Sequence, residues 1–403
     1  MPQLNHLGDP VALTVELVNI YSESWQEADI ATAVEASLTA IAQQTGLLEV
    51  VRVSNTVAAR TQLGRDQRVI LAGHLDTVPA ANNLPARLDG GTIHGLGSVD
   101  MKSGDAVFLH LIDELVGRDE LTYDITAIFY EREEIAAEHS GILQLQAAYP
   151  EWFTGDLAIL GEPTGGRIEA GCQGSIRIKV TAHGTRAHSA RAWLGENALH
   201  KLGPILTRIA GDGAREVSLD GCTYREGLNA VTAQAGVATN TIPDEASMFV
   251  NFRYAPDRST EAAVAHICAV IAGLNEDELL SAGSGEAIVA TANQSLADNG
   301  EWIDLALDDV APAAPPRLST PLAQRLIQTV SAGVPADQRS EWVRAKFGWT
   351  DVARFAQMGI PALNFGPGDP AYAHKPDEQC PVDQITTVAT ALRTFLMAVP
   401  PQS

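Results

Sequence analysis

Five short segments of the sequence carry the side chains that can bind metal ions and move protons. Each places a histidine, an aspartate or a glutamate at the end of an apolar run or in the loop beyond it. The segments are Gly73–Val78, Gly97–Lys102, Glu133–Glu134, Gly161–Pro163 and Ala373–Glu378. In open α/β sheets, ligands bind beyond the carboxyl ends of the strands. We therefore expect the five segments to meet at one edge of a sheet.

The first segment contains a histidine and an aspartate two residues apart, His74 and Asp76. Along an extended chain, both side chains point to the same side. Asp76 can then accept the second imidazole N–H of His74, which is the usual support for a metal-bound histidine. A single pair of this kind is also typical of a loop histidine with satisfied hydrogen bonds, so the other segments must support the metal interpretation.

Two further segments offer carboxylates after apolar runs. Glu133 and Glu134 follow the run Ile125–Tyr130, and Glu162 follows Leu157–Leu160. Adjacent carboxylates in a turn can serve different roles, one as a metal ligand and the other as a proton acceptor. The alternative interpretations are solvated loop charge for the glutamate pair and a strand-capping turn for Glu162 and the proline after it.

Together the segments supply histidine, aspartate and glutamate ligands but no thiolate. Such a mixed nitrogen and oxygen set suits zinc, with cobalt or manganese as alternatives. Five ligands exceed the three protein ligands typical of a catalytic site with one zinc ion. A pair of ions about 3.5–4 Å apart, bridged by one carboxylate, uses all five. The sequence therefore predicts a two-metal site.

The elements that must position these segments alternate between strands and helices. Alternation of this kind favours an α/β sheet flanked by helices. The expected strands are Leu47–Val53, Arg68–Gly73, Asp124–Tyr130, Leu157–Leu160 and Ala362–Asn364. The expected helices of this part are 10–20, Gln26–Gln43, Pro321–Val330, Asp351–Met358 and Gln384–Met397.

From Ser175 the pattern changes to the order β-α-β-β-α-β, which is typical of a small split-βαβ, ferredoxin-like domain. A stretch rich in proline and alanine, Val310–Pro316, is expected to be a linker. The strands of this region are Ser175–Ala182, Thr232–Ala238, Ala246–Arg253 and Trp302–Leu307, with helices Glu196–Ile209 and Thr260–Leu274. We predict an α/β catalytic domain in two parts, 1–175 and 313–403, with an α+β domain, 176–312, inserted between them.

The composition limits the possible partners. The 403 residues are 45% hydrophobic and 19% charged, as in globular proteins. The formal net charge of −23 makes nucleic acid and anionic membranes poor partners. The N-terminus lacks the pattern of a signal peptide, and no apolar run is long enough to span a membrane. Four widely spaced cysteines without a CxxC motif fit a reducing compartment, so we expect a cytoplasmic protein.

In their order and spacing, the motifs GHLDTVP, SVDMKSG, EREE, GEPT and AHKPDE resemble those of the co-catalytic zinc amidohydrolases and exopeptidases, a family that includes aminoacylase. The resemblance covers nearly the whole chain. It implies a mixed-sheet, zinc-exopeptidase-like catalytic domain with an inserted lid and dimerisation domain. It also implies a homodimer formed through the inserted domain.

The resemblance further implies a role for each motif residue. Glu133 would be the general base and Asp76 would orient His74. The peptide bond after Asp100 would be cis, as it often is in the family. Two zinc ions would be bound, with cobalt or manganese able to substitute. The implied ligands are His74, Asp100 and Glu162 for one ion and Asp100, Glu134 and His374 for the other.

In the inserted domain, the resemblance gives His188 the role of crossing the dimer interface to stabilise the oxyanion. Asn240 and Arg253 also match family positions, and a guanidinium is suited to bind a substrate carboxylate in two places. Ser175 and Gly348 could bind a carboxylate through a hydroxyl and a backbone N–H. The alternatives are a surface-loop histidine for His188 and a surface ion pair for Arg253.

Three segments, Gly171–Ser175, Arg186–Arg191 and Phe347–Asp351, look most like the desuccinylase branch of the family as found in actinobacteria. The resemblance implies a small N-succinyl amino acid as the substrate. Cys172-Gln173 stands where that branch often has two arginines, and Trp349 replaces a small polar residue. The alternatives are therefore another N-acyl-amino-acid deacylase, such as one resembling acetylornithine deacetylase, a dipeptidase, or a non-catalytic binding protein on the same fold.

Overall fold

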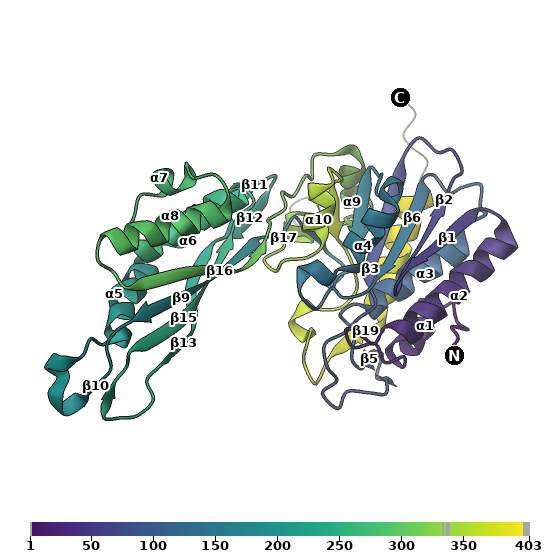
Figure 1. Ribbon diagram of the computed structural model, residues 1–403. Coiled ribbons are helices and arrows are strands. Elements are labelled where there is room, and N and C mark those ends of the chain that lie inside the picture. Colours follow the sequence, from purple (N-terminus) through teal and green to yellow (C-terminus); the bar gives the residue numbers. More distant parts are fainter. Residues whose placement is uncertain (1, 333, 336–338, 398–403) are drawn as a thin grey trace. The chain divides into compact units, whose positions relative to one another are not determined.

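The computed structural model describes residues 2–332, 334–335 and 339–397 (Figure 1). The chain divides into two units, each with its own sheet and core. Unit 1 is Met1–Ala170, Pro316–Arg344 and Arg354–Ser403, and unit 2 is Gly171–Pro315 and Ala345–Ala353. The expected α/β domain interrupted by an α+β domain is confirmed. The bounds 1–175, 176–312 and 313–403 stay a prediction of where the domains begin and end.

Unit 1 is built on a mixed eight-stranded sheet in the order β1-β2-β6-β3-β7-β18-β8-β17. The strands β6, β3, β7 and β18 are parallel to one another, and their residues are almost all buried, as expected for strands covered on both faces. The bounds are β1 Leu48–Val53, β2 Thr56–Thr61, β3 Arg68–His74, β6 Asp124–Tyr130, β7 Leu157–Leu160, β8 Ile168–Ala170, β17 Val343–Ala345 and β18 Ala362–Asn364.

Helices pack against this sheet and against one another. Helices α1, α3 and α11 contact one another, while α2 and α4 contact β1 and β2. The predicted start of the first helix is confirmed, because Asp9 caps it by accepting the N–H of Val11 at 2.9 Å. The bounds are α1 Pro10–Val18, α2 Ala28–Thr45, α3 Lys102–Leu115, α4 Gly141–Ala148, α9 Pro321–Val330, α10 Val352–Gln357 and α11 Val382–Met397.

Helix α3 was not among the expected elements, although it carries part of the site. Eleven of its residues are buried, including Lys102, Ser103 and Asp105 at its start. Buried polar residues in the first turn obscure the start of this helix in the sequence, because polar side chains are expected on the exposed face of a helix. Its position therefore follows from the tertiary packing.

A small three-stranded sheet, β19-β5-β4, holds the last motif segment in place. Gln379 of β19 is the Cα partner of His94 in β5, so the chain after His374 is fixed beside a segment almost three hundred residues earlier. The bounds are β4 Arg87–Asp89, β5 Thr92–His94 and β19 Gln379–Pro381.

Unit 2 has a four-stranded antiparallel sheet in the order β13-β15-β9-β16, with helices α5, α6 and α8 packed into its core (Figure 1). This is the strand order of a ferredoxin-like domain, as predicted. β16 extends into the expected linker, and α7 and α8 are additions to the predicted elements. The bounds are β9 Gly174–His183, α5 Ala198–Gly211, β13 Gly227–Ala235, β15 Glu245–Tyr254, α6 Thr260–Ala272, α7 Glu276–Leu280, α8 Gly285–Asp298 and β16 Ile303–Ala311.

Two short antiparallel pairs complete unit 2. One pairs β11 with β12, and the other pairs β10 with β14. Their bounds are β10 Ala187–His188, β11 Glu216–Leu219, β12 Cys222–Arg225 and β14 Thr241–Ile242. Among the helices in the described parts of the chain, none has the length and apolar character needed to cross a membrane.

Candidate metal centre and active site

The parallel strands of unit 1 bring three of the motif segments to one edge of the sheet. His74 is the last residue of β3 and pairs in parallel register with Tyr130, the last residue of β6. Leu160, the last residue of β7, pairs with Ala72 of β3. The chain therefore enters the Glu133–Glu134 and Glu162 segments at the edge where His74 lies, as the sequence predicted.

Asp100 reaches this edge from the segment just before α3. The peptide bond between Asp100 and Met101 is cis, which confirms that expectation. The buried carboxylate of Glu378 accepts the backbone N–H groups of Val99 at 2.9 Å and Asp100 at 3.1 Å. Burial raises the pKa of Glu378 to about 7, although these backbone hydrogen bonds act in the opposite direction. The sequence indicated no role for Glu378, although this residue lies in the motif AHKPDE.

Asp100 lies between the two histidines of the site. One carboxylate oxygen is 3.1 Å from His74 Nε2, and the other is 3.4 Å from His374 Nε2. His374 Nε2 is also 2.9 Å from Glu134 Oε1. A carboxylate that presents one oxygen to each of two imidazoles has the geometry of a bridging ligand.

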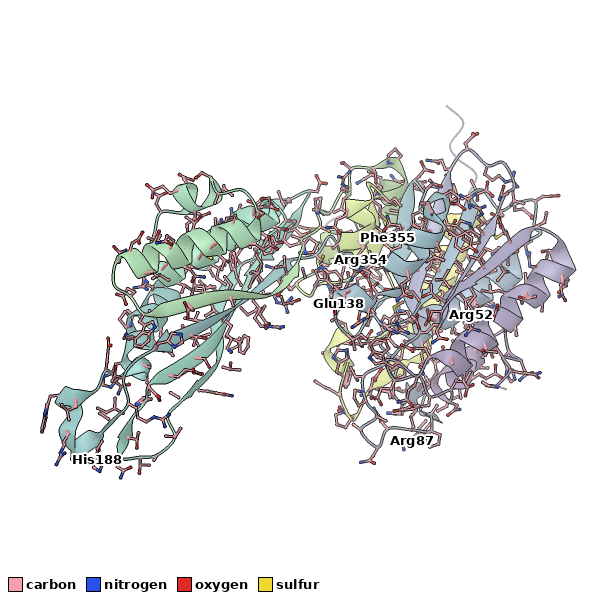
Figure 2. All side chains as sticks on the ribbon, in the orientation of Figure 1. Arg52, Arg87, Glu138, His188, Arg354 and Phe355 are labelled. Atoms are coloured by element: carbon pink, nitrogen blue, oxygen red, sulfur yellow. The ribbon has the colours of Figure 1, made fainter. Side chains whose placement is uncertain are left out.

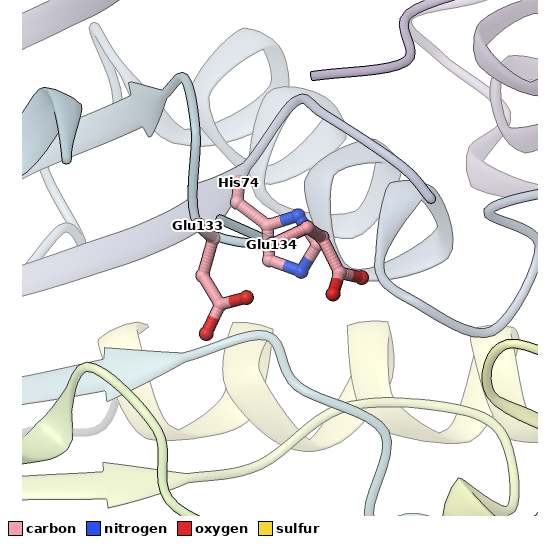
Figure 3. Close-up of side chains that lie close together, drawn as sticks. All are labelled: His74, Glu133 and Glu134. Carbon is pink, nitrogen blue, oxygen red and sulfur yellow. The ribbon is translucent and has the colours of Figure 1, made fainter. Parts of the chain in front are cut away.

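Within the described part of the chain, these side chains form two groups whose potential ligand atoms all lie within 4.8 Å of one another. The first group is His74, Glu133 and Glu134 (Figure 3), and the second is Asp100, Glu134 and His374. In Figure 3, the two glutamates leave one loop beside the end of the strand that carries His74. The predicted ligands other than Glu162 are thus brought together.

The residues fit a pair of metal ions. Two ligand atoms on one tetrahedral zinc ion lie about 3.3 Å apart, because each is about 2.0–2.1 Å from the ion. The contacts of 2.9–3.4 Å between imidazole nitrogens and carboxylate oxygens agree with that spacing. Three carboxylates beside two imidazoles also leave negative charge for cations to neutralise.

Glu162 is buried at the end of β7, but it belongs to neither of the two groups found among the described residues. Its place is set by close backbone packing. A Cβ atom on Gly104 of α3, or on Gly366, would lie 2.2 Å from the carbonyl oxygen of Gly161. Both positions therefore need glycine. The role of Glu162 as a ligand stays a prediction.

The charges within the site stabilise one another. Burial of His74 lowers its pKa, but hydrogen bonds to Asp100 and Asp76 outweigh burial and hold the pKa well above its ordinary value. Hydrogen bonds to Asp100 and Glu134 raise the pKa of His374 to about 10. Burial acts to raise the pKa of Asp100, but the two histidines outweigh it and keep the carboxylate ionised. The neighbouring carboxylates therefore favour positive charge at both histidines, which is the charge that a bound metal ion would supply.

Asp76 contacts more groups than the sequence suggested. Its backbone oxygen is 3.0 Å from His74 Nδ1, whereas its carboxylate is 3.6 Å from that nitrogen. The carboxylate accepts the backbone N–H of Glu133 at 3.0 Å and that of Glu134 at 3.1 Å. It also accepts the hydroxyl of Ser24 at 2.7 Å. Ser24 lies outside the motifs, so no sequence signal pointed to it.

The remaining predicted residues are all in unit 2. His188 lies in β10 at the tip of this unit (Figure 2), is exposed, and accepts the N–H of Ala190 through Nδ1 at 3.0 Å. Asn240 lies beside it, since its backbone oxygen accepts the N–H of Ser189 at 2.8 Å. Ser175 and the exposed Arg253 are Cα partners on β9 and β15. Gly348 lies in the segment after β17.

These residues form two pairs at opposite ends of β9. Ser175 is at the start of that strand, and the chain reaches His188 only after leaving the far end at His183. The eight residue steps from Ser175 to His183 span about 26 Å at about 3.3 Å per residue. Within one copy of unit 2, the Ser175–Arg253 pair and the His188–Asn240 pair are therefore separated by about the length of the strand.

An α/β sheet that gathers histidines and carboxylates at its carboxyl edge, with an inserted ferredoxin-like unit, defines a metal-dependent hydrolase. The chain matches Peptidase family M20/M25/M40 over residues 70–398 and belongs to that family. This match confirms the resemblance drawn from the five motifs.

The chain is similar to curated proteins over almost its whole length. It is 50% identical to the succinyl-diaminopimelate desuccinylase of Corynebacterium glutamicum, over 98% of each chain. It is 49% identical to a putative succinyl-diaminopimelate desuccinylase of Mycobacterium tuberculosis, over 96% of this chain and 98% of the relative. Among solved structures, the fold is similar to that of aminopeptidase PepT from Bacillus cereus, with a TM-score of 0.74 at 18% identity over 98% and 99% of the two chains.

Proposed function

We propose that this enzyme hydrolyses the succinyl amide of N-succinyl-LL-2,6-diaminopimelate to succinate and LL-2,6-diaminopimelate, a step in lysine and diaminopimelate biosynthesis. The observation that carries the proposal is 50% identity over 98% of the chain to a curated relative with this activity, together with the two-metal ligand groups in the expected segments.

In this proposal, His74, Asp100, Glu134, Glu162 and His374 hold two zinc ions, for which cobalt or manganese can substitute. The chemistry that such a pair of ions supplies is polarisation of the amide carbonyl and a lowered pKa of a water molecule. Asp76 fixes the backbone of Glu133 through the 3.0 Å hydrogen bond. Glu133 then takes a proton from the attacking water and delivers it to the leaving amine nitrogen.

The residues of unit 2 complete the proposed site. His188 donates a hydrogen bond to the oxyanion that develops on the amide carbonyl. Arg253 pairs with a substrate carboxylate, helped by the hydroxyl of Ser175 and the backbone N–H of Gly348. Asn240, which lies beside His188, binds the substrate together with that histidine. The hydroxyl of Ser175 is already oriented, because it accepts a hydrogen bond from Asn251 at 3.0 Å.

The first experiment compares N-succinyl-LL-2,6-diaminopimelate, N-acetylornithine and dipeptides as substrates of zinc-reconstituted protein, with a chelated sample as the control. We expect zinc-dependent release of succinate from N-succinyl-LL-2,6-diaminopimelate and much slower turnover of N-acetylornithine. Turnover of only the acetyl compound would identify the enzyme as a deacetylase. Turnover of dipeptides alone would identify it as a dipeptidase. Failure with all three would favour a binding protein on the same fold.

We also propose that the enzyme is a cytoplasmic homodimer in which His188 acts on the partner's site. β13 supports the dimer: it is an edge strand, and its residues from Asn229 to Ala235 are exposed. An unpaired strand edge is a template for pairing with another chain. The separation of His188 from Ser175 supports action in trans, because one copy of unit 2 cannot bring both to one amide. The four free, buried cysteines fit a reducing compartment.

A complementation experiment tests action in trans. His188→Ala and Glu133→Gln variants, each inactive alone, are unfolded, mixed in equal amounts and refolded. In a mixed dimer, one of the two sites has an intact Glu133 and receives an intact His188 from the other chain. We expect activity to return to about a quarter of the wild-type value. No recovery, or active monomers by light scattering, would contradict the proposal.

A further inference from the structure

Two separate segments hold the Asp76 carboxylate in unit 1. One is the loop after α1, in which the Ser24 hydroxyl donates to Asp76 and the Ser24 backbone N–H donates to Thr77 at 3.1 Å. The other is the loop after β6, in which Glu133 and Glu134 donate their backbone N–H groups to the two carboxylate oxygens. The orientation of the proposed general base therefore depends on the relative position of these two loops.

The residue next to each hydrogen-bonding segment has an uncommon backbone conformation. Trp25 follows Ser24 with a φ of 77°, and Arg132 precedes Glu133 with a φ of 62°. Residues other than glycine, and bulky ones above all, seldom adopt the left-handed region of backbone conformation. They remain there only when their surroundings fix them. Some contact must therefore hold both residues in this conformation.

Trp25 and Arg132 provide that contact for each other. The guanidinium carbon of Arg132 lies 4.1 Å from the centroid of the Trp25 ring. On the side of Arg132, Nη2 is 3.1 Å from a carboxylate oxygen of the fully buried Glu131. On the side of Trp25, the ring of His139 packs edge-on at 4.8 Å between centroids. A guanidinium over an indole face is attracted by the charge distribution of the ring.

We propose that the Trp25–Arg132 stack is a positioning device that joins the two loops holding Asp76 and so fixes Glu133 and Glu134 relative to His74. The inference rests on the proposed function, because it takes Glu133 as the general base. Arg132 and Trp25 act through the backbone of their neighbours, and neither is assigned a contact with substrate.

The variants are chosen to separate the stack from the backbone conformation and from charge. Arg132→Gly removes the guanidinium but leaves a residue for which a φ of 62° is unstrained. Arg132→Lys keeps the charge beside Glu131 without the planar guanidinium. Trp25→Ala removes the stacking face, and Trp25→Phe keeps one. Arg60→Gln is the matched control, because Arg60 lies 4.5 Å over Trp152 and is paired opposite Thr126, near the start of β6.

The first measurement is the kinetics of the metal-loaded variants. We expect Arg132→Gly and Trp25→Ala to lower kcat by about 10- to 100-fold, as for other residues that orient a metal site, with KM changed by less than about 2-fold. The double variant should lose no more than either single variant, because both remove the same contact. Arg132→Lys should retain little of the wild-type kcat, whereas Trp25→Phe and Arg60→Gln should have a kcat near that of the wild type.

The second measurement is hydrogen exchange of the Glu133 and Glu134 amides in the metal-free protein, which needs no substrate. We expect these amides to exchange at least about 10-fold faster in Trp25→Ala and Arg132→Gly, and at the wild-type rate in Arg60→Gln. Unchanged exchange and kcat in Trp25→Ala would overturn the proposal, as would additive losses in the double variant. If the wild type hydrolyses none of the three substrates but Trp25→Ala still frees these amides, the proposed function fails while the positioning role stands.

Discussion

Asp76 fixes the backbone of Glu133, because its Oδ1 accepts the Glu133 N–H at 3.0 Å across 57 residues of sequence. The other carboxylate oxygen accepts the next N–H, that of Glu134. One buried carboxylate thus holds the backbone of two neighbouring glutamates, of which Glu133 is the proposed proton acceptor and Glu134 a proposed metal ligand. Burial acts to raise the pKa of Asp76, but His74, Glu133 and Ser24 outweigh it, so the pKa lies below its ordinary value and the group is ionised.

Asp76→Asn tests this arrangement. An asparagine has only one carboxamide oxygen, so one of the two N–H groups loses its acceptor. We expect kcat to fall by about 10- to 100-fold while the fold is retained. Asp124→Asn is the matched control: Asp124 accepts the N–H groups of Leu63 and Arg65, but it lies at the start of β6. That variant should lower the melting temperature and leave kcat unchanged. Equal effects of both variants on kcat would contradict the positioning role of Asp76.

Glu133→Gln tests the general base. The amide side chain has nearly the same size as the carboxylate but cannot accept a proton at neutral pH. We expect kcat to fall by about 10²- to 10⁴-fold with the metal content unchanged, because Glu133 is not among the proposed metal ligands, all of which remain. Metal analysis of the purified variant, alongside steady-state kinetics, checks both parts. Undiminished turnover would remove Glu133 from the role of base.

Metal removal tests the two ligand groups. A cation bound only to the folded state stabilises it by about 2.7 kcal/mol at a concentration one hundred times its dissociation constant. We expect a chelator to abolish turnover and to lower the melting temperature of unit 1, which holds all the predicted ligands. Restored zinc should reverse both effects. His374→Ala should weaken metal binding and reduce the shift, and an unchanged shift in that variant would count against His374 as a ligand.

Glu226 gives unit 2 a pH-dependent stability. Burial acts to raise the pKa of Glu226, but hydrogen bonds from Arg215, Ala255 and Arg258 outweigh it and lower the pKa below its ordinary value of 4.5. A lowered pKa in the folded state means that the stabilisation is present above the unfolded pKa and is lost as the pH falls through the folded pKa. We expect Glu226→Gln to destabilise unit 2 by about 1.5–3 kcal/mol at pH 7.

The measurement for Glu226 is denaturant unfolding of both proteins at pH 7 and at pH 3. The difference in the free energy of unfolding should be largest at pH 7 and should shrink below about pH 4.5. Glu245→Gln serves as the control, because Glu245 is an exposed glutamate in the same unit. A difference that stays constant with pH would show that the Glu226 carboxylate charge contributes nothing.

The sequence by itself determined much of the fold. The apolar runs at Asp124–Tyr130 and Leu157–Leu160 match β6 and β7, and the order of strands and helices after Ser175 predicted the ferredoxin-like unit. These features are local, because periodicity and capping depend on neighbours along the chain. The motif segments also located the candidate ligands. His74, Glu134 and Glu162 lie at strand ends or in the loops beyond them, whereas Asp100 precedes α3 and His374 precedes β19.

Only the tertiary structure decided how those ligands are held. Helix α3 begins with buried polar residues, Lys102, Ser103 and Asp105, so only the packing shows how its first turn is enclosed. Ser24 and Trp25 belong to no motif, and Arg132 lies in EREE without an expected role, yet the three residues join the loops around Asp76. Glu378 reaches the amides of Val99 and Asp100 across 279 and 278 residues. Contacts between such distant residues depend on the packing of the whole unit, and that is why spacing along the chain could not predict them.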